Sequence, residues 1–214
     1  MSGVEVLSRI SILRPRTTAS IRALRRQISK EIAAEKREAV LALAYEFIDI
    51  DPHSRWIAYE LVQNHPATRD KITTAEVERL GEGLSSWGSV DAFACFISGP
   101  AWREGHVRDA VIRRWAKSKD RWWRRAALVS TVPLNVRARG GSGDAARTLT
   151  ICVLLLADRD EMVVKALSWA LRALAKRDAA AVRQFMEKFA DELAPLVKRE
   201  VRNKLMTGLK NPRY

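Results

Sequence analysis

Residues 160–176, with the sequence DEMVVKALSWALRALAK, carry the clearest helical pattern in the chain. At 100° per residue an apolar stripe forms on one side of this helix, made of Val163, Leu167, Ala170, Leu171 and Leu174. The opposite side collects Lys165, Trp169, Arg172 and Lys176. An indole among cations suits contact with a sugar or base beside a phosphate. The alternative is that this second face packs against a neighbouring helix.

The same helical composition continues on both sides of this segment. Neither glycine nor proline occurs between Arg16 and Asp51, or between Asp144 and Ala194, and such stretches predict helix. Breaks at Asp51-Pro52, His65-Pro66, residues 81–88, Gly99-Pro100, Pro133, residues 140–143 and Ala194-Pro195 cut the chain into about ten helical segments. Residues 140–143 lack the lysine of a phosphate-binding loop and predict a flexible connector. With no clear period-2 alternation, the chain is expected to be all-α.

A weak repeat sets the expected architecture. Arg125, Lys165 and Arg199 each belong to a basic helical segment with an apolar-x-cation core. Their spacing of about 34–40 residues is typical of two-helix HEAT or armadillo units. We therefore expect a HEAT/armadillo-like α–α superhelical solenoid, forming a single domain over residues 1–214. Chance similarity among basic amphipathic helices is the alternative.

The charge predicts a polyanion as partner. The 214 residues include 38 Lys plus Arg and 25 Asp plus Glu, a net charge of +13. Each phosphate neutralised by a cation releases condensed counterions, so such an excess favours nucleic acid. Three separated clusters suit an extended duplex better than a small ligand: residues 14, 16, 22, 25 and 26; residues 121, 124 and 125; and residues 198, 199, 202, 204, 210 and 213.

Several classes of protein are excluded. The two cysteines, Cys95 and Cys152, are far apart, which excludes a disulfide framework and a cysteine zinc site. The three histidines lack metal-binding spacing, and no apolar run is long enough to cross a bilayer. We expect no metal, no cofactor and no membrane partner. We also expect a cytoplasmic monomer that associates with the nucleoid when bound to DNA.

Two further segments could carry chemistry. Arg121 and Arg125 lie four residues apart on one face, next to Trp122 and Trp123, and the sequence does not decide which indole faces inward. In the second segment, Trp87 and Asp91 are one turn apart if a helix begins near Trp87. An acid near a helix start is commonly a cap, so capping is the alternative to a functional role for this aspartate.

Four motifs in order resemble the AlkD-like DNA alkylation repair glycosylases. They are Trp87-x-Ser89-Val90-Asp91, Asp120-x-Trp122-x-x-Arg125-Ala126-Ala127, Val164-Lys165-Ala166-x-x-Trp169-x-Leu171-Arg172 and Ala194-Pro195-Leu196-x-Lys198-Arg199-Glu200. The resemblance covers roughly Thr17 to Leu205. Residues 12–16 depart from the family pattern, so no residue of the N-terminal helices is carried over.

This resemblance implies a helical solenoid that holds duplex DNA and hydrolyses the N-glycosidic bond of cationic N3- or N7-alkylpurines, leaving an abasic site. By position it implies Asp91, Trp87 and Trp169 as catalytic residues and Arg125 as a backbone contact. Further candidates for DNA binding are Lys165, Arg172, Arg121 and Arg199. Two alternatives remain: a non-catalytic binder of DNA structures on the same scaffold, and a protein-interaction scaffold for an acidic partner.

Overall fold

The computed structural model describes residues 1–212, and every regular element within them is helical. The chain divides into two compact units, unit 1 over Met1–Glu82 and unit 2 over Gly83–Tyr214. No helix in the described range is long and apolar enough to span a membrane. The all-α prediction is confirmed.

Unit 1 is built around α3. Its helices are α1 (Gly3–Ser11), α2 (Thr18–Glu31), α3 (Arg37–Ile50), α4 (Trp56–Gln63), α5 (Pro66–Arg69) and α6 (Thr74–Gly81). Helix α3 packs against α1, α4 and α5, and it buries Phe47 completely. The prediction of unbroken helix between Arg16 and Asp51 is wrong, because a turn separates α2 from α3. Tertiary packing of α3 against α1 and α4 overrides the helix propensity of this turn.

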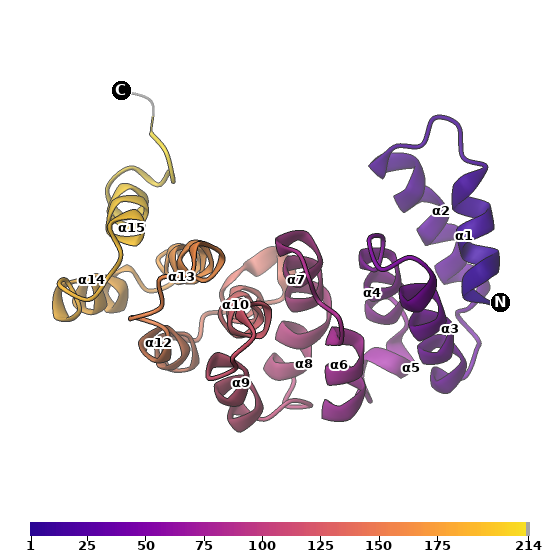
Figure 1. Ribbon diagram of the computed structural model, residues 1–214, viewed down its shortest axis with the longest axis horizontal. Helices are drawn as coiled ribbons and strands as arrows, with labels where there is room; N and C mark the ends of the chain where they lie inside the picture. The colour runs from indigo at the N-terminus through magenta and orange to yellow at the C-terminus, as the bar shows by residue number, and fades with distance from the viewer. Residues whose placement is uncertain (213–214) are drawn as a thin grey trace. The chain divides into compact units, whose positions relative to one another are not determined.

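Unit 2 stacks its helices in two rows (Figure 1). Its elements are α7 (Trp87–Phe93), the π-helix η1 (Ala94–Ser98), α8 (Gly99–Arg103), α9 (Asp109–Ala116), α10 (Arg121–Val129), α11 (Val132–Asn135), the 3-10 helix η2 (Arg137–Arg139), α12 (Ala145–Leu154), α13 (Glu161–Leu174), α14 (Ala179–Lys188) and α15 (Pro195–Thr207). In one row α7 contacts α10, α10 contacts α13, and α13 contacts α15. The other row holds α9, α12 and α14. This stacking is that of an α solenoid, as predicted.

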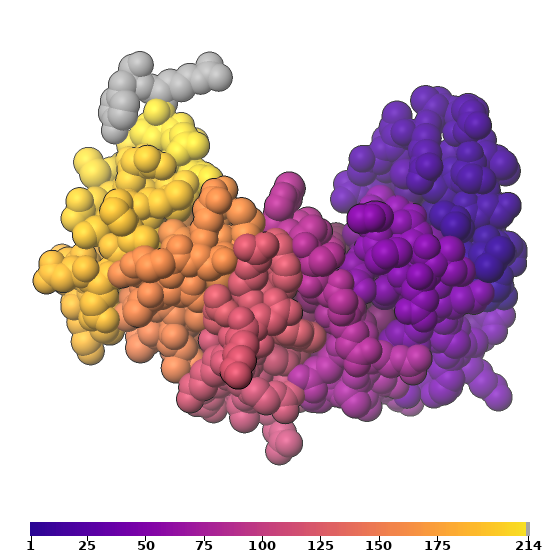
Figure 2. Space-filling model, viewed as in Figure 1, coloured from indigo at the N-terminus to yellow at the C-terminus, as the bar shows by residue number. Residues whose placement is uncertain are grey.

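Successive helices of unit 2 meet mainly their neighbours in the stack. In the space-filling view each colour band of unit 2 borders the next one along the chain (Figure 2). Such nearest-neighbour packing is the basis of solenoid stability. Because each helix is fixed by the one before and the one after it, equivalent positions on successive helices come close together.

The predicted repeat coincides with equivalent positions in the stacked row. Helices α7, α10, α13 and α15 begin at Trp87, Arg121, Glu161 and Pro195. Asp91, Arg125, Lys165 and Arg199 are therefore each the fifth residue of their helix. The spacing of the repeat positions in the sequence is thus the spacing between the helix starts.

Helix α13 is enclosed except for one stripe. Nine of its 14 residues are buried, including every member of the predicted apolar stripe. The accessible positions within the helix are Glu161, Met162, Lys165, Trp169 and Arg172. They recur every three or four residues, so they share one face. Of the four residues predicted opposite the stripe, Lys165, Trp169 and Arg172 are thus at least partly accessible, and Lys176 follows the end of the helix. Arg172 also pairs with Glu200 of the neighbouring α15, so part of this face packs against another helix, as the alternative predicted.

The helical path continues through Gly99-Pro100, where the sequence predicts a break. Residues 94–98 widen into a π-helix, in which the amide of Gly99 donates to the carbonyl of Ala94. Pro100 then occupies the beginning of α8, where a missing N–H is tolerated. The wider turn accommodates the proline without ending the helix, and it joins α7 directly to the packed α8.

Residues 140–143 form a packed loop, so the prediction of a flexible connector is wrong. The amide of Gly141 donates to the carbonyl of Val136 (3.1 Å), and the amide of Gly143 donates to Leu134 (2.9 Å). The Arg177 guanidinium donates to the carbonyl of Gly141 at 3.2 Å. Gly141 is buried against the Pro133–Leu134 backbone, which leaves no room for a side chain.

We expect Gly141→Ala to destabilise the protein. A Cβ at this position would lie 2.4 Å from the carbonyl oxygen of Pro133, and relieving this overlap requires the backbone to move. Overpacking of this kind costs about 1–3 kcal/mol of unfolding free energy, measurable by urea denaturation. Gly88→Ala, which meets no atom within 4 Å, is the control and should be neutral or stabilising. Equal stability of the two variants would contradict the packed loop.

Candidate active site

The first helix of unit 2 presents Trp87 and Asp91 from its first two turns. The hydroxyl of Ser86 caps α7 by accepting from the amide of Ser89 (3.2 Å). Because Ser86 provides the cap, the capping interpretation of Asp91 is wrong. Trp87, the first helical residue, is 62% exposed. Its indole is therefore available for contact with a ligand.

Asp91 and Arg125 form a two-point ion pair between α7 and α10. Nε of Arg125 donates to one carboxylate oxygen of Asp91 at 2.9 Å, and Nη2 donates to the other at 3.0 Å. Nη1 of Arg125 donates to the carbonyl oxygen of Met162 on α13 at 2.5 Å. One guanidinium thus fixes three helices, and every nitrogen of it has a protein acceptor.

The pair is unequally buried. The Arg125 side chain is 6% exposed, whereas the Asp91 side chain is 18% exposed. Burial raises the pKa of the Asp91 carboxyl above its usual value, and the hydrogen bonds and charge of Arg125 oppose that rise. The carboxylate is consequently the member of the pair that reaches the surface. The expected contact of Arg125 with a DNA backbone stays a prediction, although the guanidinium is already engaged by protein.

The indoles of α10 face in opposite directions, which the sequence left undecided. Trp123 packs inward, with its ring centroid 4.8 Å from that of Trp115 and 5.9 Å from that of Phe93. Trp122 instead lies under the guanidinium of Arg121, which is 4.8 Å from the ring centroid. Trp122 therefore belongs to the accessible end of α10.

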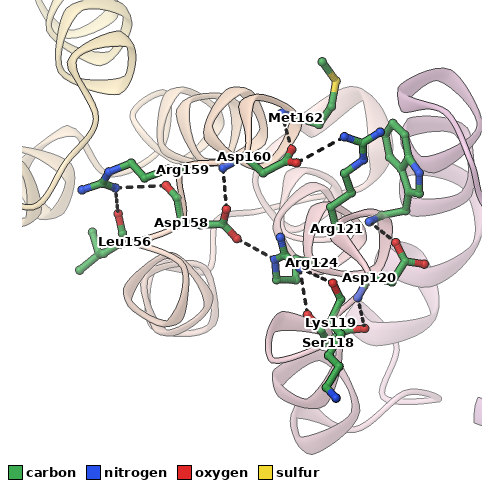
Figure 3. Close-up of polar contacts among 11 residues, drawn as sticks. Ser118, Lys119, Asp120, Arg121, Arg124, Leu156, Asp158, Arg159, Asp160 and Met162 are labelled. Atoms are coloured by element: carbon green, nitrogen blue, oxygen red, sulfur yellow. Dashed lines mark hydrogen bonds and ion pairs between the residues drawn. The ribbon is translucent and has the colours of Figure 1, made fainter.

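Polar contacts between α10 and the loops that precede α10 and α13 hold the N-terminal ends of these two helices (Figure 3). The Arg124 guanidinium donates to Asp158 at 2.7 Å and to the carbonyls of Ser118 and Lys119. Asp160 caps α13 by accepting from the amide of Met162 (2.8 Å). These bonds hold the N-terminal ends of α10 and α13 in place, and with them the candidate site residues in the first turns of both helices.

The other predicted DNA-binding cations lie near the surface. Arg121 is half exposed and its ion pair with Asp160 is long, at 3.5 Å. Lys165 is paired with Glu161 within α13 at 2.5 Å and is 45% exposed. Arg199 is exposed on α15. Exposed ion pairs such as those of Arg121 and Lys165 contribute little stability, so neither side chain is firmly held by its carboxylate partner.

The basic charge is concentrated in unit 2. Unit 1 has 13 Lys plus Arg against 12 Asp plus Glu, a net charge of +1, whereas unit 2 has 25 against 13, a net charge of +12. Within the N-terminal basic cluster, Arg22 and Arg25 are both paired with the buried carboxylate of Glu60. The described residues contain no group of three or more His, Cys, Asp or Glu side chains that could hold a metal ion.

Sequence reasoning did not single out Glu200 as a functional residue. Its carboxylate is 4% exposed and accepts from the hydroxyl of Ser168 at 2.6 Å. Arg172 and Lys210 lie 3.6 and 3.2 Å from it. The sequence feature that could have indicated it is that Glu200 is the lone acid among the cations of residues 196–214.

We expect Arg125→Gln to raise the pKa of Asp91 further. The substitution removes the charge that opposes the effect of burial, so the neutral carboxyl becomes more favourable. Carbon-13 NMR titration of the Asp91 carboxyl measures the shift. Arg124→Gln is the matched control, because Arg124 is paired with Asp158 and should leave Asp91 unchanged. Equal pKa values in wild type and Arg125→Gln would show that Arg125 does not set the charge of Asp91.

Comparison with known proteins supplies the family. Searches of curated proteins and of solved structures found no match to the chain. The family described as "DNA alkylation repair enzyme" matches residues 16–205, which include Trp87, Asp91 and Trp169 and the five arginines and lysines expected to bind DNA. This match extends through most of both units. The chain therefore belongs to the DNA alkylation repair enzyme family.

Proposed function

We propose that this protein is a monofunctional DNA glycosylase that releases positively charged N3- or N7-alkylpurines from duplex DNA. The observation that carries the proposal is the partly exposed carboxylate of Asp91, fixed by Arg125 within a unit of net charge +12. Cations attract the phosphate backbone, and a carboxylate stabilises the positive charge that develops on the sugar as the base departs. Membership in a DNA alkylation repair family agrees with this substrate class.

The proposed reaction needs no general acid. Alkylation at N3 or N7 gives the purine a formal positive charge, so the base departs as a neutral molecule. The C1′–N bond breaks and its electron pair leaves with the base, which creates an oxocarbenium-like sugar. Water then forms the new bond to C1′ and loses a proton, leaving an abasic site.

Asp91 stabilises the positive sugar in this mechanism. A carboxylate about 4 Å from the developing charge, at an effective dielectric constant near 20, contributes roughly 4 kcal/mol. That energy corresponds to about three decades in rate. Each oxygen of Asp91 accepts one bond from Arg125, and a carboxylate oxygen has a second lone pair. The free lone pairs can orient the attacking water.

Trp87 and Trp169 provide the aromatic faces of the proposed site. Trp87 is exposed one turn before Asp91, and Trp169 lies on the accessible stripe of α13. An indole face attracts a positive charge, and this attraction strengthens when water is excluded. Both rings would therefore favour the electron-poor sugar over its neutral precursor.

We expect Asp91→Asn to reduce excision of 7-methylguanine by about 10³-fold, in proportion to the lost carboxylate stabilisation. Binding to undamaged duplex should be retained, because the cations of unit 2 are unchanged. Single-turnover release of 7-methylguanine from a defined methylated duplex measures the rate, and fluorescence anisotropy measures the affinity.

Asp109→Asn is the matched control, since Asp109 is also an aspartate paired with an arginine of unit 2, Arg147 at 3.0 Å, but lies on α9 in the other row. It should excise at the wild-type rate. Full activity of Asp91→Asn, with both variants folded by circular dichroism, would remove Asp91 from the mechanism. Absence of release by the wild type would favour the non-catalytic DNA binder.

We expect Trp87→Ala to lower the single-turnover rate by about 10- to 100-fold, which corresponds to the loss of one cation–π contact of about 1–2 kcal/mol and of its shielding from water. The melting temperature should change little, because the indole is already 62% exposed. A large loss of stability with an unchanged rate would show that Trp87 is structural.

A further inference from the structure

Unit 1 contains a groove of about 650 Å³ between α3 and α6 that the proposed function does not use. Its apolar lining comes from Leu41, Ala42 and Tyr45 on α3 and from Ala75 on α6. The lining residues of α3 recur every three or four positions, so one face of this helix forms a wall of the groove. Both alanines are exposed, and the apolar surface of the groove is therefore open to solvent.

Carboxylates outnumber cations in this groove. Four acids line it, Glu38, Glu46, Asp49 and Glu76, and Arg79 is the one cation among the described residues that line it. This balance is the opposite of that of the whole chain, which has a net charge of +13. Such a surface repels a polyanion and attracts a cationic partner.

Contacts between α3 and α6 hold the groove in shape. Nη2 of Arg37, the first residue of α3, donates to the carboxylate of Glu76 on α6 at 2.6 Å. The Arg79 guanidinium of α6 lies 3.9 Å from the ring centroid of Tyr45 on α3. A preformed groove lowers the entropy cost of binding, because its side chains are already ordered.

Two of the carboxylates are available to a partner. Glu46 is engaged by the amide of Gly3, which donates to it at 2.8 Å. Asp49 is exposed, and no cation within residues 1–212 pairs with it. Glu38 is also exposed, and its pair with the adjacent Arg37 is long, at 3.3 Å. Exposed pairs contribute little stability, so neither Asp49 nor Glu38 is firmly held within the protein.

The spacing of these two carboxylates favours an extended cation over a single ion. Glu38 and Asp49 are about 16 Å apart along the axis of α3. No group of three or more acids, cysteines or histidines in the described part of the chain could hold a metal ion. An amphipathic helix of about three turns has the required length. Its apolar face can cover the exposed apolar lining while its cations reach the carboxylates.

We propose that the groove between α3 and α6 is a docking site for a basic amphipathic helix of a partner protein. Apolar side chains of that helix pack on Ala42, Tyr45 and Ala75, and its lysines or arginines pair with Glu38 and Asp49. The groove belongs entirely to unit 1, whereas the basic charge of the chain belongs to unit 2. This inference goes beyond the proposed glycosylase activity and does not depend on it.

Binding of a synthetic helix to the full chain tests the site. The probe is a leucine–lysine peptide of about 12 residues, or roughly 18 Å of helix, with leucine at every third or fourth position. Ala42→Arg places a bulky cation in the groove and should weaken binding by at least about 10-fold, measured by fluorescence anisotropy. Ala23→Arg is the matched control, because Ala23 is an exposed alanine of α2 that does not line the groove. Equal affinities of these two variants would overturn the site, as would failure of the wild type to bind the peptide.

Glu38→Gln and Asp49→Asn test the charge complementarity. Each should weaken binding of the peptide by about 2- to 5-fold, the range of one exposed ion pair, and the double variant should reduce the salt dependence. Asp70→Asn removes an exposed acid of unit 1 that lies outside the groove, and it should leave the affinity unchanged. An unchanged affinity in the double variant would contradict pairing with these carboxylates.

Three further measurements separate a docked helix from other occupants. A peptide of the same composition, reordered so that the leucines no longer form a stripe, should bind at least about 10-fold more weakly. Equal binding by the reordered peptide or by spermine would overturn the helix in favour of any polycation. Self-association of the chain that Ala42→Arg abolishes would overturn it in favour of a second copy. Release of 7-methylguanine by Ala42→Arg should match that of the wild type, so failure of docking and failure of excision are seen separately.

Discussion

The buried guanidinium of Arg125 is the interaction on which the arrangement of unit 2 depends. It donates to Asp91 on α7 and to the carbonyl of Met162 on α13, while its own backbone belongs to α10. A buried charge is tolerated when it is paired and its N–H groups are satisfied, whereas removing one partner costs several kcal/mol. The stacking of these helices and the position of the carboxylate are therefore one structural feature. A change that loosened the stack would also move the acid.

Two oppositely oriented ion pairs present charges of opposite sign toward the surface of unit 2. In the first, the arginine is enclosed and the acid is presented; in the second, Glu200 is enclosed and Arg172 is presented. Both pairs bridge adjacent helices of the same row, so each stabilises the stack while leaving one charged group at the surface. In a solenoid each repeat packs on its neighbours, so the α7–α10 and α13–α15 interfaces can each hold such a pair. The difference in burial within each pair decides which sign of charge reaches the surface.

Much of the helical pattern could be read from the sequence. The apolar stripe of α13 and the spacing of Arg125, Lys165 and Arg199 report local periodicity and helix spacing, which propensity and packing determine. The partners of the charged residues could not be predicted, because Asp91 and Arg125 are far apart in the sequence and any arginine of the chain could have paired with the acid. The capping interpretation of Asp91 failed for the same reason: only the fold shows that Ser86 already occupies the cap. The turn between α2 and α3 and the packed loop around Gly141 likewise depend on contacts between distant segments.

Burial of Arg125 also bears on whether Asp91 stays ionised during the proposed reaction. A duplex that binds unit 2 brings phosphates to its exposed cations, which cancels much of the positive potential that would otherwise keep a half-buried carboxyl ionised. A surface arginine beside Asp91 would be drawn toward those phosphates. Arg125 is enclosed, and its nitrogens already donate to Asp91 and to the carbonyl of Met162. In the proposed mechanism, an enclosed cation beside the acid and exposed cations elsewhere on unit 2 would allow one surface to attract a polyanion and still present a negative charge to a cationic nucleoside.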